Sequence, residues 1–364
     1  MSLPEVIIES HIPFVPEGFL AGAAHVRFLA PEAITPESVR DAAALIVRTR
    51  TRCDAALLEK SAVLFVATAT IGTDHIDMPW CRSNGIKVVS APGCNAPAVA
   101  QYVWSSIIRL LPDTWREITL GIVGLGHVGS IVADWGRRLG VRVIACDPPR
   151  RRDHGGWNAA DPYSAGTESF CTLAEIARQA DVVTFHTPHV REGEFPTHHI
   201  AGKEFFDSLE RCPLIINAAR GPIIDTEAIL SASAAKKCFG SVVDCWEGEP
   251  AISGDLLASA LIATPHIAGY SVEGKRRATH TVLTALVEDL SRRGLVSDAD
   301  AAAAMSQLPP SPPAVPAGFR ITPEAIVASY DPMADTALLR NGFTPGRFEQ
   351  LRNGYALRHE VGFS

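Results

Sequence analysis

The chain has 364 residues, 47% hydrophobic and 20% charged, a balance that excludes a disordered protein and fits a globular one. Because the N-terminus shows no secretory signal, we expect a cytoplasmic protein. Its formal net charge of -7 argues against a nucleic-acid partner. We expect no membrane contact either, because no apolar run reaches spanning length and the N-terminus lacks a basic region followed by an apolar core. The length predicts two domains. The eight cysteines are scattered without a C-x-x-C pair, which favours buried thiols over a disulfide framework.

Short apolar runs alternate with possible helices in the N-terminal part of the chain. The alternation predicts a small α/β domain with a parallel sheet, whose strands we place at residues 6–8, 45–47, 64–66 and 88–89. Two strands are followed by polar residues, which include Thr49 and Thr70. Ligands collect beyond the carboxyl ends of parallel strands, so these threonines are candidates for ligand contact, although threonines that only cap turns are an alternative. A helix predicted at residues 98–111 then carries the chain into a second domain.

A glycine-rich motif opens the second domain. An apolar run at residues 120–123 leads into a G-x-G-x-x-G spacing, a helical apolar period follows, and residues 141–146 indicate a second strand. In this context the motif predicts a dinucleotide site, whereas the spacing alone also occurs in turns without a ligand. Asp147, about twenty residues beyond the glycines, would accept hydrogen bonds from a ribose and repel a 2′-phosphate, which favours NAD over NADP. The cofactor candidates in this stretch are Gly124, Gly126, His127, Val128, Gly129 and Asp147.

Further strands are predicted beyond Asp147, and each is followed by polar or special residues. We place these strands at residues 181–185, 214–216, 241–243 and 261–263, and expect their ends to converge on one crevice. Oxidation of a 2-hydroxy acid needs a cation for the carboxylate, a base for the hydroxyl proton and a hydride acceptor. Arg220 suits the first role, His266 the second, and Glu249 would orient the imidazole. Each residue alone has an ordinary structural explanation, but together they indicate a dehydrogenase.

The segments at residues 217–221, 244–250 and 264–270 resemble the D-isomer specific 2-hydroxyacid dehydrogenase family. A closer resemblance, to the branch of that family that oxidises 4-phospho-D-erythronate in pyridoxal 5′-phosphate biosynthesis, covers residues 68–75, 91–96, 146–150, 246–250 and 266–275. The resemblance implies that Arg220, Glu249 and His266 are catalytic. It adds four NAD contacts, namely Thr187, Ala218, Asp244 and Gly269, and three substrate contacts, namely Thr49, Thr70 and Tyr270.

The resemblance also implies the architecture. We expect an α/β protein with a Rossmann-type doubly wound parallel sheet in an NAD domain at residues 97–265, and a flavodoxin-like α/β substrate domain at residues 1–96 and 266–293. Residues 294–364 would form a linker and a shortened dimerisation region of a homodimer. The stretch after Arg150 resembles an inserted surface loop. We expect no metal, because the adjacent His198 and His199 would diverge on a helix without a carboxylate partner.

Two alternatives remain open for function. The first is another D-2-hydroxy acid substrate, for example phosphoglycerate, because the catalytic residues are shared and only the phosphate-end residues discriminate. The second is a non-catalytic, NAD-sensing protein similar to the family's corepressors. The presence of Arg220, Glu249 and His266 argues against the second alternative, although such corepressors can keep these residues.

Overall fold

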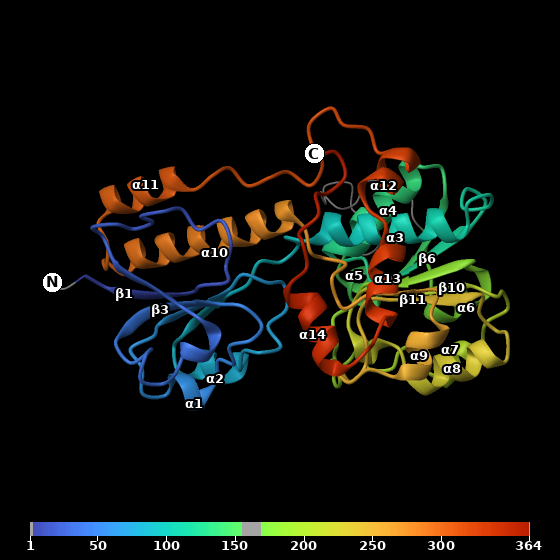
Figure 1. The fold of residues 1–364 in the computed structure, drawn as a ribbon, viewed down its shortest axis with the longest axis horizontal. Helices are drawn as coiled ribbons and strands as arrows, with labels where there is room; N and C mark the ends of the chain where they lie inside the picture. The colour runs from blue at the N-terminus through green and yellow to red at the C-terminus, as the bar shows by residue number, and fades with distance from the viewer. Residues whose placement is uncertain (1–2, 155–168, 364) are drawn as a thin grey trace. The chain divides into compact units, whose positions relative to one another are not determined.

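The structure, a computed structural model, describes residues 3–154 and 169–363. The chain divides into two compact units (Figure 1). The first unit consists of Met1–Asn95 and Val272–Ala314, and the second of Ala96–Ser271 and Val315–Ser364. Most of the insertion expected after Arg150 lies outside the described residues. Each unit contains one parallel sheet, so the predicted fold class is confirmed.

The first unit has a five-stranded sheet with the order β2-β1-β3-β4-β5, which is the flavodoxin-like order. All of its strands pair in parallel. The strands are β1 (Glu5–Glu9), β2 (His25–Leu29), β3 (Ala42–Val47), β4 (Phe65–Thr68) and β5 (Lys87–Val89). The sequence did not predict the edge strand β2, whose residues are exposed or half-buried because the strand has a neighbour on one side alone.

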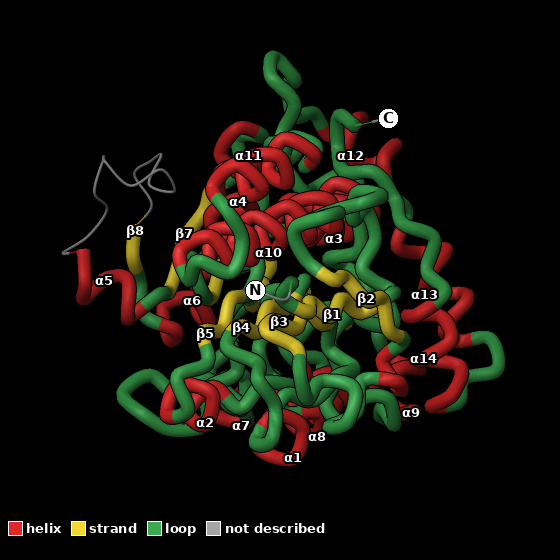
Figure 2. Tube along the Cα trace, turned by 90° about the vertical axis from the view of Figure 1, so that its left-hand side faces the viewer, coloured by secondary structure: helices red, strands yellow, loops and turns green. Residues whose placement is uncertain are grey.

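Helices cover both faces of this first sheet (Figure 2). On one face α10 (Val272–Arg292) and α11 (Asp298–Gln307) share a hydrophobic cluster with β1, β3 and β4. On the other face α1 (Ala55–Leu58) and α2 (Met78–Ser83) close a second cluster, and a short 3-10 helix covers Pro31–Ala33. Burial on both faces explains why the inner strands are continuous apolar runs rather than alternating ones.

The second unit has a seven-stranded parallel sheet with the order β12-β11-β10-β9-β6-β7-β8. If β6 is counted as strand 1 and the sheet is read from the β8 edge, the order is 3-2-1-4-5-6-7. This is the Rossmann arrangement, with a switch point between β6 and β9. The strands are β6 (Thr119–Val123), β7 (Arg142–Cys146), β8 (Ser169–Phe170), β9 (Val182–Phe185), β10 (Leu214–Asn217), β11 (Gly240–Val243) and β12 (Ile262–Ala263). A ligand crevice is expected where β6 and β9 end.

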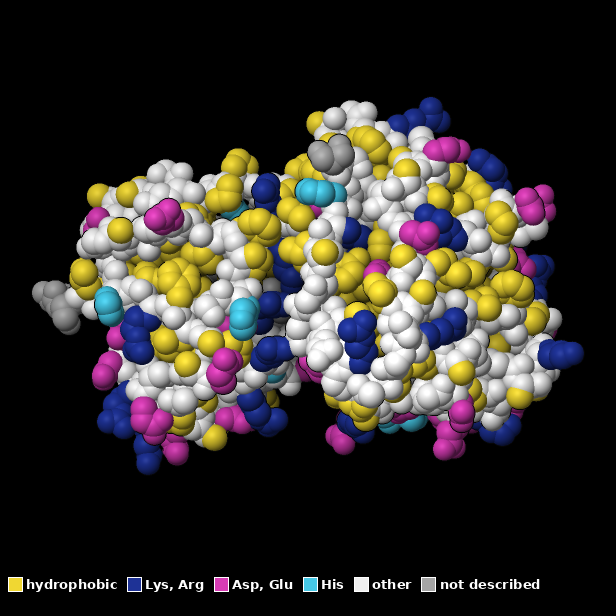
Figure 3. All heavy atoms as spheres, in the orientation of Figure 1, with side chains coloured by type: hydrophobic (Ala, Val, Ile, Leu, Met, Phe, Trp, Pro, Cys, Tyr) yellow, Lys and Arg dark blue, Asp and Glu magenta, His cyan; other side chains and the backbone are white. Residues whose placement is uncertain are grey.

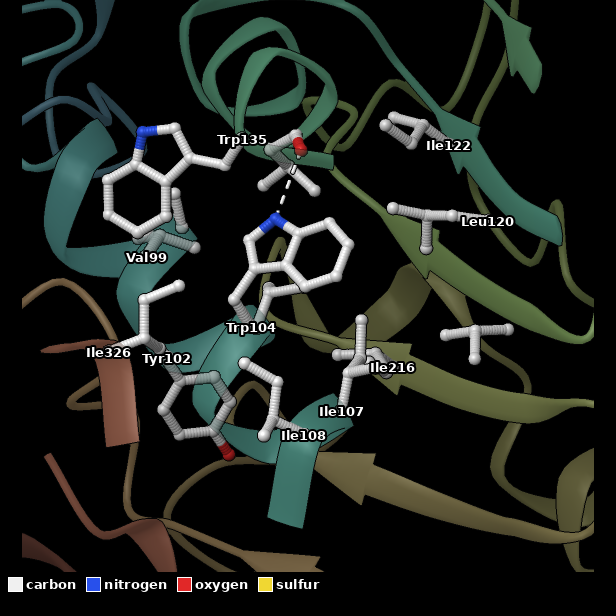
Figure 4. Packing of buried hydrophobic residues seen from close by; sticks show 14 of the residues in the cluster. Val99, Tyr102, Trp104, Ile107, Ile108, Leu120, Ile122, Trp135, Ile216 and Ile326 are labelled. Atoms are coloured by element: carbon white, nitrogen blue, oxygen red, sulfur yellow. Dashed lines mark hydrogen bonds between the residues drawn. The ribbon is translucent and has the colours of Figure 1, made fainter. Parts of the chain in front are cut away.

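Two long helices, α3 (Ala96–Leu110) and α4 (His127–Arg138), cover one face of the second sheet. Trp104 of α3 is fully buried there and donates its indole N–H to the Val132 carbonyl, 3.0 Å away (Figure 4). The opposite face packs against a second cluster. The helices that contribute residues to that cluster include α6 (Leu173–Gln179), α7 (Lys203–Asp207), α8 (Thr226–Ala234) and α9 (Gly254–Ser259). Helix α5 (Pro148–His154) follows β7.

The C-terminal segment differs from the expected separate region. Residues up to Ala314 pack with the first unit, and Val315 onward with the second. The helices of the second part are α12 (Pro323–Ser329), α13 (Pro332–Arg340) and α14 (Pro345–Asn353), and each begins with a Thr or Asp cap followed by proline. Their apolar residues complete the cores of the second unit, as Ile326 does in Figure 4. Likewise, residues 266–271 belong to the second unit and not to the first.

The surface carries both signs of charge. On the face drawn in Figure 3, Lys and Arg side chains are mixed with Asp and Glu side chains. No helix among the described residues is both long enough and apolar enough to span a bilayer.

Candidate active site

The glycine turn joins β6 to α4. Gly124 has φ +94°, and a Cβ there would lie 2.9 Å from the His186 backbone. A Cβ on Gly129 would lie 1.9 Å from the Gly124 carbonyl oxygen, so only glycine permits this contact of helix and turn. Gly126 caps α4 without a side chain, and a Cβ there would meet nothing within 4 Å. The exposed N-terminus of α4, which also carries His127 and the half-buried Val128, can therefore receive a pyrophosphate.

Asp147 follows β7 and lies beside the glycine turn. Its Oδ2 accepts the Leu125 backbone N–H at 2.8 Å, and its Oδ1 accepts the Arg150 N–H at 2.9 Å. The Arg150 guanidinium in turn donates to the Leu125 carbonyl and to Ser130 Oγ. The carboxylate is thus fixed and half-buried at the tip of the turn, where the predicted ribose contact requires it.

Two unpaired polar atoms lie beyond β9, on the other side of the switch point. Thr187 Oγ1 and His186 Nδ1 are buried without a hydrogen-bond partner among the described residues. Burial lowers the pKa of His186 to about 3, so this imidazole is neutral. Buried polar atoms normally have a partner. Their position at the switch point, opposite the open helix N-terminus, fits a dinucleotide with its polar nicotinamide end beyond β9.

Asn217, the last residue of β10, organises the loop that carries Ala218 and Arg220. Its buried amide donates to the Arg220 carbonyl at 3.0 Å and to the Cys245 carbonyl at 3.1 Å, and its Oδ1 accepts the Ala219 N–H at 3.2 Å. The half-buried Arg220 donates from Nη1 to the Ala219 carbonyl at 2.8 Å. Asn217 has no role among the residues predicted from the sequence, although a polar side chain that ends an apolar strand is the signal that could have identified it.

Glu249 and His266 form a direct pair. The imidazole Nδ1 lies 2.9 Å from Glu249 Oε2, and Oε1 of the same carboxylate accepts the Trp246 N–H at 2.7 Å. His266 has φ +57°, an uncommon conformation for a non-glycine residue and one that clusters at functional sites. With Nδ1 donating to the carboxylate, Nε2 is the nitrogen left for proton exchange with a ligand.

The two members of this pair stabilise each other's charged forms. Burial alone would lower the pKa of His266, yet Cys245 and Glu249 outweigh it and raise this pKa well above its usual value. Burial raises the pKa of the Cys245 thiol, which keeps it neutral, so Glu249 is the charged partner. Burial opposes ionisation of Glu249, but the charge and hydrogen bond of His266 prevail and lower the Glu249 pKa.

Asp244 holds the loop on which His266 stands. Asp244 is 1% exposed, and its carboxylate accepts hydrogen bonds from the Thr264 hydroxyl at 2.6 Å, the Ile267 N–H at 2.8 Å and the Ala268 N–H at 3.0 Å. Burial raises its pKa despite the opposing charge of His266. The carboxylate thus binds the loop that carries His266, just before Gly269, and its predicted NAD contact would add to that role.

The C-terminal segment also holds this loop, a contribution that the sequence did not reveal. Arg358 donates to the carbonyls of Ile267 and Tyr270, each at 3.1 Å, and to that of Ala268. Ser271 Oγ donates to the buried Glu360 at 2.7 Å. The rings of Tyr270 and Tyr355 meet edge to face with centroids 6.1 Å apart.

The predicted substrate residues of the first unit share one sheet edge. The strands β3 and β4 pair with Val47 opposite Thr68, so Thr49 and Thr70 follow their ends together. Thr49 is exposed, whereas the half-buried Thr70 Oγ1 lies 2.7 Å from Thr68 Oγ1. These contacts are all within the first unit, while Tyr270 belongs to the second.

The geometry expected for His198 and His199 is wrong. Both lie in a turn, and their rings stack with centroids 4.0 Å apart instead of diverging on a helix. A carboxylate is also present, because His199 Nε2 lies 2.6 Å from Glu247 Oε1. In the part of the chain that the structure describes, no group of three or more His, Cys, Asp or Glu side chains is arranged to hold a metal ion.

Solved structures share this fold. The holo form of D-mandelate dehydrogenase from Rhodotorula graminis superposes with a TM-score of 0.66 at 21% identity, over 80% of this chain and 94% of that chain. D-Lactate dehydrogenase from Aquifex aeolicus, solved with NAD and lactic acid, gives a TM-score of 0.63 at 21% identity, over 80% and 96% of the two chains. The model of the "D-isomer specific 2-hydroxyacid dehydrogenase, NAD binding domain" matches residues 97–268. Fold, site and match define an NAD-dependent dehydrogenase acting on a CH–OH group, and the expected cofactor is confirmed.

Sequence relatives narrow this class. Erythronate-4-phosphate dehydrogenase of Bacteroides fragilis is 42% identical over 361 residues, which cover 98% of this chain and 97% of the relative. The enzyme of the same name from Marinobacter nauticus is 39% identical, over 98% of this chain and 92% of the relative. The chain belongs to the erythronate-4-phosphate dehydrogenase family. The contacts of individual residues with NAD and substrate stay predictions.

Proposed function

We propose that this protein oxidises 4-phospho-D-erythronate with NAD⁺ to (R)-3-hydroxy-2-oxo-4-phosphooxybutanoate, as a step of pyridoxal 5′-phosphate biosynthesis. The observation that carries the reaction type is the Glu249–His266 pair, with Nδ1 and Oε2 2.9 Å apart, on loops at the carboxyl ends of a dinucleotide-binding sheet. The relatives named above support the choice of substrate. We further propose a cytoplasmic homodimer.

In this mechanism each residue has one task. NAD⁺, when bound, supplies the hydride acceptor. Arg220 holds the substrate carboxylate with its planar guanidinium, for which a bidentate contact is the preferred geometry. His266 Nε2 takes the proton of the C2 hydroxyl, and Glu249 stabilises the resulting imidazolium through Nδ1. The turn conformation of His266 and the bonds of Asp244 to the same loop keep the imidazole in place.

The purified protein tests the proposal directly. It is incubated with NAD⁺ and, in turn, 4-phosphoerythronate, erythronate, 3-phosphoglycerate and lactate, while nicotinamide absorbance is recorded. A 2-oxo acid is added in parallel to reoxidise cofactor that stays bound. We expect the highest kcat/KM with 4-phosphoerythronate. A higher kcat/KM with 3-phosphoglycerate would make that acid the preferred substrate. NAD binding without turnover of any acid would favour an NAD-sensing protein.

Substrate choice is expected to depend on hydroxyls that bind the phosphate. We propose this role for Thr49, Thr70 and Tyr270. Loss of a hydrogen bond to a charged group removes about 1.5–3 kcal/mol, or roughly ten- to a hundred-fold in specificity. Thr70→Ala and Tyr270→Phe should therefore reduce kcat/KM for 4-phosphoerythronate far more than for erythronate.

The matched control is Tyr355→Phe, which removes the hydroxyl of the ring that packs against Tyr270. That hydroxyl lies 3.3 Å from Arg358 and 3.4 Å from Asp335, so its loss should affect both substrates equally. If Thr70→Ala and Tyr270→Phe also reduced kcat/KM equally for both substrates, these residues would shape the site without binding the phosphate.

A further inference from the structure

A second cation shares the carboxylate of Glu249. Arg352 Nη1 lies 3.8 Å from Glu249 Oε2, the same oxygen that lies 2.9 Å from His266 Nδ1. The side chains of Arg352 and Glu249 are 21% and 18% exposed, so water screens this contact less than it would screen a surface pair. The catalytic carboxylate is therefore held between an imidazole and a guanidinium.

Helix α14 fixes the position of Arg352. Thr344 caps the helix by accepting the Arg347 N–H, and Pro345 occupies its first turn. Phe348 is fully buried in the cluster that also contains Trp246. Residues four apart lie on the same helix face, so the anchored Phe348 directs Arg352 toward the loop that carries Glu249. A further contact with the Tyr270 hydroxyl holds the guanidinium and contributes to the raised Arg352 pKa, which burial alone would lower.

The groups that face the pair come from several elements. His266 is faced by Asp244, Cys245 and Glu249 from the loop after β11. Glu249 is faced by His266, the Trp246 N–H and Arg352. Arg352 is faced in addition by Tyr270 and Glu349. Among these groups Arg352 is the permanent cation, since a guanidinium stays protonated at any working pH.

We propose that Arg352 is a positioning residue for the oxidation described above: it shares Glu249 with His266 and thereby sets the pH range in which His266 accepts the substrate proton. This inference rests on the proposed function. Arg352 partly neutralises the negative charge of Glu249, which would otherwise stabilise only the imidazolium of His266. The positive charge of Arg352 also repels that imidazolium. Both effects favour the neutral imidazole, which is the form that takes the proton of the C2 hydroxyl while the hydride leaves C2 for NAD⁺.

The test compares Arg352→Met, which removes the charge, with Arg352→Lys, which keeps it. In Arg352→Met the acidic limb of kcat/KM for oxidation should move to higher pH by roughly 1 unit, the lower end of the range for a nearby charge. Reduction of the 2-oxo acid by NADH needs the protonated imidazole, so its basic limb should also move upward. Oxidation at low pH is then impaired while reduction at high pH improves. Arg352→Lys should stay close to the wild type.

A purely structural role predicts a different outcome. Equal losses in both directions at every pH, or an unchanged profile, would overturn the proposal. Arg347→Met is the matched control, because it removes the same charge from the same helix, and its profile should equal that of the wild type.

A second measurement does not depend on turnover. The His266 imidazole is titrated by NMR in the protein without substrate, with its resonance assigned from His266→Gln, and its pKa should be higher in Arg352→Met than in the wild type. If the wild type failed to oxidise 4-phosphoerythronate, the proposed substrate would be wrong. The titration would still test the role of Arg352. An unchanged His266 pKa would overturn the inference.

Discussion

The glycine turn and the loop at residues 266–271, called the catalytic loop after the role proposed for His266, occupy the same edge of one sheet, but they are held in different ways. The turn depends on neighbours close in sequence: Gly124 donates to the Cys146 carbonyl at 2.8 Å, and Asp147 accepts from Leu125, 22 positions away. The catalytic loop depends on distant ones, since Arg358 lies 91 positions beyond Ile267, whose carbonyl it binds. The glycine turn and Asp147 can thus be encoded in one short segment, whereas the proposed proton-transfer site is assembled from several.

The largest effect should come from removing the imidazole. His266→Ala is expected to lower kcat by roughly 10²- to 10⁴-fold, the range for losing a general acid–base. NAD affinity, measured by fluorescence or calorimetry, should change little because the glycine turn is intact. A variant that kept full turnover would remove His266 from the mechanism, and a large loss of NAD affinity would erase the distinction between the two regions.

The next largest effect should come from Arg358→Ala, which removes the long-range support of the catalytic loop. Each buried carbonyl left unpaired costs about 1–3 kcal/mol. Both the free energy of unfolding and kcat should fall, while NAD affinity of the folded fraction persists. Arg340→Ala is the matched control, because Arg340 of α13 donates to the Leu257 and Ala260 carbonyls. The Arg340→Ala variant should be less stable than the wild type and have the same kcat. Equal losses of kcat in the two variants would mean that Arg358 serves stability alone.

The sequence predicted what short segments specify. The glycine spacing, the period of α4 and the position of Asp147 were readable because turn, helix and strand are adjacent in the chain. Arg220, Glu249 and His266 were found as polar residues after apolar runs, since parallel strands bring their carboxyl ends to one edge. Short apolar runs predicted most strands, but not the short edge strands β2 and β8, and the two sheet types were implied by the family resemblance rather than by the runs.

What the sequence did not predict depends on contacts between distant residues. Arg352 and Arg358 belong to the segment expected to form a dimerisation region, and nothing in their neighbours indicates that they meet Glu249 and Tyr270. The stacked turn of His198 and His199 was mistaken for a helix because a histidine pair carries no periodicity. The C-terminal helices were assigned to a separate region because their apolar residues could not be matched to a core before that core was known.

A smaller effect is expected within the glycine turn. Gly129→Ala places a methyl group 1.9 Å from the Gly124 carbonyl oxygen, and such overpacking costs about 1–3 kcal/mol. A thermal melt should show this loss together with weaker NAD binding. Gly126→Ala has open space around its Cβ and a φ of -68°, so it should keep stability and weaken only NAD binding. If Gly126→Ala bound NAD normally, the proposed approach of the pyrophosphate to this backbone would be wrong.

The smallest effect is expected at Asp147. Asp147→Ala removes the acceptor for the ribose hydroxyls and the charge that would repel a 2′-phosphate, so the ratio of kcat/KM with NAD to that with NADP should fall. The Leu125 N–H also loses its partner, which costs about 0.5–1.5 kcal/mol of stability. Unchanged kinetics with both cofactors would contradict the ribose contact.

The clamp by Arg358 and Glu360 has a consequence for biosynthesis. The ribosome makes the chain from the N-terminus, so all seven strands of the second sheet are synthesised before residue 272, where the chain departs to complete the first unit. The residues that contact Ile267 and Ser271, Arg358 and Glu360, are made 91 and 89 positions later. A nascent chain can therefore form its glycine turn early, while the loop that carries His266 gains these contacts only after the segment with Arg358 and Glu360 has been made. Premature termination shortly before Arg358 would then yield a protein that still binds the dinucleotide but handles the substrate proton poorly.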